Sequence, residues 1–119
     1  MLAEILIGLV ALEHLGFLLL EAVFWRRPLG RKVFGLSEHD AALTAPLAAN
    51  QGLYNGFLAA GLVWALIASD PGMARSLAVF FLCCVGVAGA FGAVTVKRTI
   101  LWIQGLPAAI ALLAVLAGN

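Results

Sequence analysis

One stretch decides the fold: LTAPLAANQGLYNGFLAAGLVWALIA, residues 43–68. It is apolar over a length that suffices for a helix to cross a membrane. The segment NQGLYNG, residues 50–56, nevertheless places two asparagines, a glutamine and a tyrosine within it. Polar side chains in hydrocarbon must find hydrogen-bond partners, so such a cluster indicates either a lined cavity or a seam where helices pack.

The whole chain has the composition of an integral membrane protein. Of its 119 residues, 64% are hydrophobic and only 11% are charged, which lies far outside the range of soluble domains. Because a membrane helix needs about 20 apolar residues, the length allows one domain of about four spans and leaves nothing for a soluble domain. A net charge of +1 gives no argument for a nucleic-acid partner.

The apolar stretches predict an all-α fold, a bundle of four transmembrane helices that forms a single domain over residues 1–119. Ser37-x-x-Asp40 is a capping signature for the second helix, and Ser69-Asp70-Pro71-Gly72 is a turn before the third. Residues 26–42 are expected to form a polar connection. The predicted spans are residues 2–25, 43–68, 73–96 and 100–116.

Basic residues set the predicted orientation. The connections after the first and third spans hold Arg26, Arg27, Arg31, Lys32, Lys97 and Arg98, whereas the other side holds Arg75 alone. The positive-inside rule therefore places loops 26–42 and 97–99 in the cytoplasm and both termini outside. These cations suit contact with membrane lipid headgroups, and the alternative is capture of an anionic substrate at the cytoplasmic mouth.

Polar residues of three spans are predicted to converge in the cytoplasmic half of the membrane. At about 1.5 Å per residue, Glu21 lies roughly 6 Å inside the end of its span and His14 roughly 16 Å inside. His14 and Glu21 share one face of the first span, and Glu13 points about a quarter-turn away. The converging residues are Glu13, His14, Glu21, Asn50, Gln51, Tyr54, Asn55 and Gln104.

These residues suggest a site for a small lipophilic ligand. A carboxyl group in hydrocarbon costs about 2.5–3.5 kcal/mol, which favours a functional role for Glu13 and Glu21. Glu13 or His14 would act as acid or base, with Tyr54 as a proton donor. The expected ligand-binding residues are Glu21, Asn50, Gln51, Asn55, Lys97 and Gln104.

Structural alternatives stay open for the same residues. His14 fits a hydrogen-bonded core histidine, a general base or an axial ligand to haem, and the amides could simply tie helices together. No residues have the spacing of a zinc or iron–sulfur site, so no protein-held metal is expected. Cys83 and Cys84, adjacent in an apolar run, are expected to be buried free thiols.

Motifs spread over almost the whole chain are long and unusual enough to be specific. They are Leu12-Glu13-His14, Gly30-Arg31-Lys32-Val33-Phe34-Gly35-Leu36, Ala49-Asn50-Gln51-Gly52-Leu53-Tyr54-Asn55-Gly56-Phe57, Lys97 and Gln104-Gly105-Leu106-Pro107. Together they resemble a family of small bacterial membrane proteins known as domain of unknown function 1304. The resemblance implies four helices in a bacterial inner membrane and supplies no activity.

A second resemblance concerns the second span alone. Gln51-Gly52-Leu53-Tyr54-Asn55-Gly56 is similar to the Glu-Gly-x-x-Asn-Gly stretch of hydroxylaminobenzene mutases and, more loosely, to the equivalent helix of styrene oxide isomerase. These small four-helix membrane isomerases imply a lipophilic aromatic substrate and, for the epoxide isomerase, a haem that acts as a Lewis acid. Their histidine aligns with Ala49 here, so a haem would need His14 as its ligand.

Three functions therefore compete. The first is a membrane-embedded enzyme, favoured as an isomerase, and the second is a small proton-coupled transporter. The third is an assembly module in which the polar groups only specify helix packing. The motifs Gly86-x-x-x-Ala90 and Gly89-x-x-x-Ala93 serve close packing within the chain or between subunits. A homo-oligomer is expected in every case, because four short helices enclose little interior.

Overall fold

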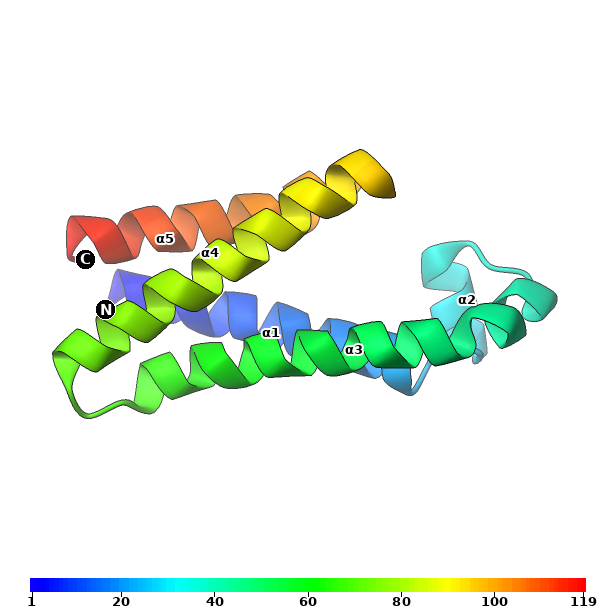
Figure 1. Cartoon of the computed structure of the whole chain (residues 1–119), viewed down its shortest axis with the longest axis horizontal. Coiled ribbons are helices and arrows are strands. Elements are labelled where there is room, and N and C mark those ends of the chain that lie inside the picture. The colour runs from blue at the N-terminus through cyan, green and yellow to red at the C-terminus, as the bar shows by residue number, and fades with distance from the viewer. The chain divides into compact units, whose positions relative to one another are not determined.

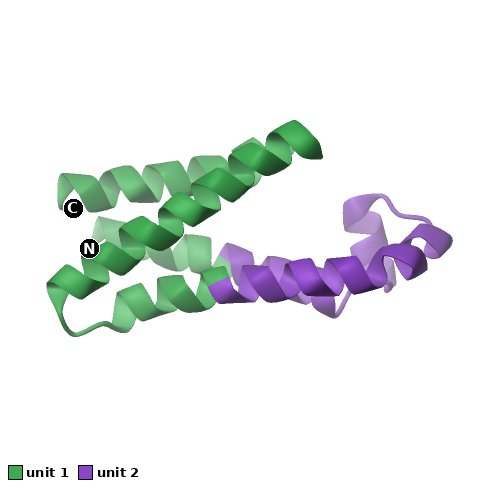
Figure 2. Cartoon of the chain, viewed as in Figure 1, with its two compact units in different colours: residues 1–12, 58–119 green, residues 13–57 purple.

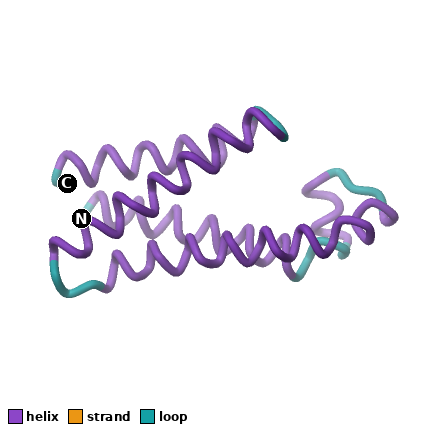
Figure 3. The backbone as a smooth tube through the Cα atoms, in the orientation of Figure 1, coloured by secondary structure: helices purple, strands orange, loops and turns teal.

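The computed structural model describes all 119 residues, and its regular elements are all helices (Figures 1 and 3). The all-α prediction is therefore confirmed. The elements are α1 (Leu2–Ala22), α2 (Pro28–Phe34), α3 (Glu38–Ile67), α4 (Pro71–Thr95), the π-helical segment η1 (Leu101–Gly105) and α5 (Leu106–Ala117).

Two helices begin at side-chain caps, and the sequence predicts the one at Ser37. Ser37 precedes α3, and its Oγ accepts a hydrogen bond from the backbone N–H of Asp40 at 3.0 Å. Asp70 precedes α4, and its carboxylate accepts from the backbone N–H of Met73 at 2.7 Å. Each cap satisfies a backbone donor that the first helical turn leaves without a partner. Pro46 lies inside α3, which continues past it.

Residues 26–42 are not the simple polar connection that the sequence predicts, because they contain the short helix α2. Pro28 occupies its first turn, where the missing N–H costs nothing, and Gly35 ends it with φ +65° in the left-handed region. Pro28 and Gly35 are therefore the start and stop signals of a helix.

The last helical stretch begins with a π turn. The backbone N–H of Leu106 bonds to the carbonyl of Leu101, five residues back. Pro107 explains the wider turn, since its ring has no N–H and would crowd the carbonyl four residues earlier in a regular α-helix. This π turn contains Gln104, one of the predicted ligand-binding residues.

The chain forms two compact units (Figure 2). The first unit contains residues 1–12 and 58–119, and the second contains residues 13–57. Each unit holds one part of α1 and one part of α3.

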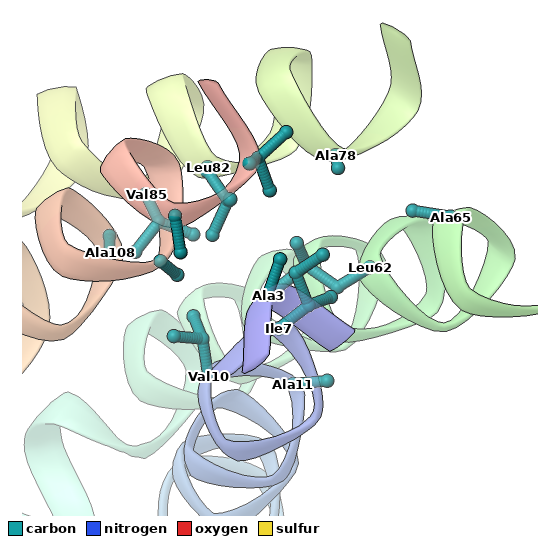
Figure 4. Packing of buried hydrophobic residues seen from close by; sticks show 13 residues of the cluster. Ala3, Ile7, Val10, Ala11, Leu62, Ala65, Ala78, Leu82, Val85 and Ala108 are labelled. Atoms are coloured by element: carbon teal, nitrogen blue, oxygen red, sulfur yellow. The ribbon is translucent and has the colours of Figure 1, made fainter. Parts of the chain in front are cut away.

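The core of the first unit is built mainly from small side chains (Figure 4). Alanines fill much of it, and Leu62, Leu82 and Val85 are at most 1% exposed. Helices pack closely when small residues line their contact. The buried cluster comprises Ala3, Ile7, Val10, Ala11, Leu62, Ala65, Ala78, Leu82, Val85, Ala108, Ala111, Ala114 and Val115.

Two glycines of α4 pack against residues 100–105, which follow the turn after α4. A side chain on Gly89 would meet the backbone of Gly105, and one on Gly92 would meet Ile100. Gly86 has nothing within 4 Å of where its Cβ would lie. Intramolecular packing, one of the two interpretations of these motifs, therefore holds for Gly89 and leaves Gly86 on an open face.

The expectation of two buried thiols is wrong for one of them. Both cysteines are free, but Cys83 is exposed and Cys84 is only partly buried. Successive helical residues point about 100° apart, and the adjacent Leu82 already occupies the core. Cys83 consequently turns away from the packed face of α4.

In the second unit, residues 13–22 of α1 pack against residues 38–57 of α3 at a glycine pair. A Cβ on Gly52 would lie 3.1 Å from the backbone nitrogen of Ala22 and 3.2 Å from the carbonyl oxygen of Leu18. A Cβ on Gly56 would lie 3.3 Å from the Leu18 side chain. Gly52-x-x-x-Gly56 thus lets the two backbones approach closely.

Two helices, α1 and α4, are long and apolar enough to cross a membrane. Within the chain, only 28% of the apolar stretch of α1 is buried, and only 22% of that of α4. Helix α3 has 30 residues, but its amide cluster makes it less apolar. The apolar stretch Leu101–Ala117 is shorter than a typical span.

Candidate functional site

The polar groups that the structure brings together lie at the glycine crossing of α1 and α3 in the second unit. Asn55 is 4% exposed, and its Nδ2 donates a hydrogen bond to Oε1 of Glu21 at 2.8 Å. Gly52 and Gly56 lie on either side of Asn55 in the sequence and allow this side chain to reach α1. The pair therefore joins two helices through a carboxyl–amide hydrogen bond.

His14 lies on the same face of α1, seven residues before Glu21. Its side chain has 0% exposure, and its ring meets Phe17 edge to face with centroids 5.5 Å apart. The predicted alignment of His14 and Glu21 on one helix face agrees with this burial, because residues seven apart share a face.

The carboxyl group of Glu13 differs from that of Glu21 in its hydrogen bonding. One carboxyl oxygen, Oε2, is buried and accepts no hydrogen bond. Buried polar atoms are nearly always hydrogen-bonded, because leaving one without a partner costs about 1–3 kcal/mol. Glu13 is therefore the one carboxyl of the second unit with a buried oxygen that no group of the chain satisfies.

Three predicted residues of α3 do not join this group. Asn50, Gln51 and Tyr54 are exposed within the chain, and the Tyr54 ring contacts Phe57 with centroids 6.2 Å apart. The face of α3 that meets α1 contains Gly52, Asn55 and Gly56, and the other three residues lie outside it.

The remaining predicted residues belong to the first unit. Lys97 is exposed in the turn that follows α4, and Gln104 is partly buried in the π turn of η1. The convergence of these two residues with the carboxyls of the second unit stays a prediction.

A haem on His14 does not fit this arrangement. An axial ligand needs one ring nitrogen to face a space of porphyrin size. The His14 side chain has no exposed surface, and it does not line either of two hollows on the first unit. One hollow lies along Arg75, Val79, Phe80 and Cys83 of α4, and the other lies where the ends of α1, α3, α4 and α5 meet.

Sequence reasoning missed the glycine pair that builds the crossing. Gly52 and Gly56 are four residues apart, which is the small-x-x-x-small spacing already noted in the predicted third span. Applied to the second span, the same signal would have selected the helix face with Gly52 and Gly56 as the packed face. It would also have separated Asn55 from its exposed neighbours.

Comparison with known proteins identifies the family. A model described as "Protein of unknown function (DUF1304)" matches residues 8–116, so the chain belongs to this family. No curated protein and no solved structure matches the chain significantly. The resemblance of the second span to membrane isomerases stays a prediction.

Proposed function

We propose that this member of the DUF1304 family is a four-span membrane protein whose α1–α3 crossing binds a small lipophilic molecule. The spans would be α1, α3, α4 and the continuous stretch of η1 and α5. The surface of these helices supports this proposal, since large apolar side chains such as Leu9, Leu12, Leu47, Phe91 and Leu113 are 57–74% exposed. Such a surface needs lipid or another protein to cover it.

The low burial of α1 and α4 further supports the membrane assignment. A core helix of a soluble protein is also long and apolar, but it is mostly buried, and these two are not. Helix α3 would cross with its few polar groups either paired, as Asn55 is, or facing other helices. The orientation that follows from the basic residues places both termini outside an inner membrane.

Thiol labelling tests this orientation. In a background of Cys83→Ser and Cys84→Ser, a membrane-impermeant maleimide should label Ser69→Cys in intact spheroplasts. It should label His39→Cys only after permeabilisation, because residues 26–42 are proposed to be cytoplasmic. Both positions are exposed, so access depends on the membrane alone. Labelling of both positions in intact spheroplasts, or the opposite pattern, contradicts the four-span topology.

The buried oxygen of Glu13 carries the ligand proposal. Oε2 lacks a donor in the chain, whereas the Glu21 carboxyl already accepts from Asn55. A ligand with an apolar body and a hydroxyl or amine donor would satisfy Oε2 and could enter from the lipid. Asn55 and Glu21 would hold the two helices in place around it. If this ligand is a substrate, isomerisation suits the site, because Glu13 can remove a proton and return it without a co-reactant.

Native mass spectrometry of the detergent-solubilised chain tests ligand binding. The wild type should release a copurified lipophilic compound on dissociation, and Glu13→Leu should lose it because the acceptor is gone. Glu4→Leu is the matched control, since Glu4 is exposed near the start of α1. The same spectra report the number of subunits, which we propose to be more than one.

Two results would contradict ligand binding at Glu13. One is a wild type that carries no small molecule, and the other is equal occupancy in wild type and Glu13→Leu. A thermal unfolding transition shared by wild type and variant shows that a lost ligand does not reflect a lost fold.

A further inference from the structure

The segment around α2 carries four cations and no acidic residue. Arg26, Arg27, Arg31 and Lys32 lie between Glu21 and Glu38. The one ion pair of the chain joins the N-terminal amine to Glu4, so none of these four is neutralised by a carboxylate. Arg27 lies 5.8 Å from the centroid of the Phe24 ring. The chain therefore presents a concentrated positive charge that it does not balance itself.

The second unit holds α2 in a fixed position. A Cβ on Gly30 would overlap the carbonyl of Phe24, so this glycine permits a close backbone contact. The Trp25 ring packs on Phe34 with centroids 4.7 Å apart, and its Nε1 donates to Oγ1 of Thr44 at 3.0 Å. These contacts tie both ends of α2 to its neighbours, so its cations are presented on a preorganised surface.

The free face of α2 combines apolar and basic side chains. Leu29 and Val33, four residues apart, are 53% and 54% exposed, and Lys32 is exposed beside them. Arg31 is partly buried, and its Nε is a buried donor without an acceptor. A face with apolar residues next to unpaired cations is typical of helices that lie in a membrane interface.

We propose that α2 is an interfacial helix that binds the headgroups of anionic phospholipids. Leu29 and Val33 enter the boundary between headgroups and acyl chains, while Arg26, Arg27 and Lys32 contact phosphates. Arg31 completes its hydrogen bonding on a phosphate oxygen. Charge complementarity selects an anionic lipid over a zwitterionic one, because the segment has no carboxylate to meet a choline. This inference rests on the proposed membrane placement and is independent of the ligand at Glu13.

Lipid titration of the full chain in neutral detergent, followed by native mass spectrometry, tests this proposal. Phosphatidylglycerol should bind more tightly than phosphatidylcholine, and added salt should weaken its binding. Lys32→Gln and Arg31→Gln should each lower the affinity for phosphatidylglycerol about fivefold. Arg75→Gln removes the same charge from α4, on the side opposite α2 in the proposed topology, and should leave the affinity unchanged.

Several outcomes would overturn the inference. They are equal affinity for the two lipids, an equal loss in Arg75→Gln, and no loss in either α2 variant. Displacement of the lipid by inorganic phosphate at comparable concentration would reveal a site for free anions instead. Lys32 is exposed and makes no contact that holds the fold, so Lys32→Gln keeps the test valid if Arg31→Gln fails to fold.

Washing the membranes with alkaline carbonate distinguishes two cases: α2 does not bind anionic lipid, or the chain is not a membrane protein at all. Release of the chain from membranes would contradict the placement itself. A chain that stays in the membrane without preferring phosphatidylglycerol would overturn only the role of α2.

Discussion

Gly89→Leu is expected to destabilise the first unit by about 1–3 kcal/mol, the usual cost of forcing extra atoms into a packed contact. A Cβ on Gly89 would lie 2.8 Å from the nitrogen of Gly105 and 2.9 Å from its Cα. These are backbone atoms, which cannot rotate away as a side chain can. Helix α4 and segment η1 would have to separate, and the neighbouring contact of Gly92 with Ile100 would change with them.

Gly86→Leu is the matched control for this prediction. Gly86 lies on the same helix and has open space where its Cβ would point. Both substitutions replace glycine by leucine within α4, so both gain the same helix propensity. The difference in stability between the two variants therefore reports the cost of the packing contact. Unfolding by denaturing detergent, followed by circular dichroism, measures that difference. Equal stability of the two variants would contradict the close contact of Gly89 with Gly105.

Asn55→Leu is expected to be the most damaging substitution among the polar residues of α3. It removes the donor at 2.8 Å from Glu21 and leaves that carboxyl without this partner, at a cost of about 1–3 kcal/mol. Replacing both partners together is close to neutral in many proteins, so the double variant with Glu21→Leu should recover most of the loss. The coupling between the two sites is the quantity to measure.

Asn50→Leu provides the control, because Asn50 is exposed within the chain. It should leave stability nearly unchanged, although the substitution is the same and lies only five residues away. A full double-mutant cycle with Glu21→Leu, measured by reversible unfolding in detergent, gives both the single costs and the coupling. Additive costs for Asn55 and Glu21, or an equal loss in Asn50→Leu, would contradict the bond.

Helix identity follows from the sequence because apolar length and capping chemistry are local properties. The starts of α3 and α4 obey the Ser37 and Asp70 caps, which depend on residues within one turn. Helix α2 was missed because a proline and a glycine close together resemble a turn. The seven residues from Pro28 to Phe34 are enough for a short helix when neighbouring groups such as Trp25 and Thr44 hold it in place.

The candidate site could be predicted only in part. Composition shows which residues are costly in hydrocarbon, and the chain buries Glu13, His14, Glu21 and Asn55 at least in part. Composition could not separate Asn55 from Asn50, Gln51 and Tyr54, because the face that packs is set by the partner helix. The pairing of Glu21 with Asn55 joins residues 34 positions apart, which no local pattern encodes.

Carbodiimide labelling of Glu13 in native membranes tests the central claim most directly. A lipophilic carbodiimide enters hydrocarbon and reacts with carboxyls there, whereas a water-soluble one reaches exposed carboxyls such as Glu38, Asp40 and Asp70. The lipophilic reagent is predicted to modify Glu13, since its Oε2 has no partner, and to modify Glu21 less because Asn55 occupies it. Modification of Glu13 by the water-soluble reagent alone would contradict a carboxyl placed inside the membrane to meet a lipophilic ligand.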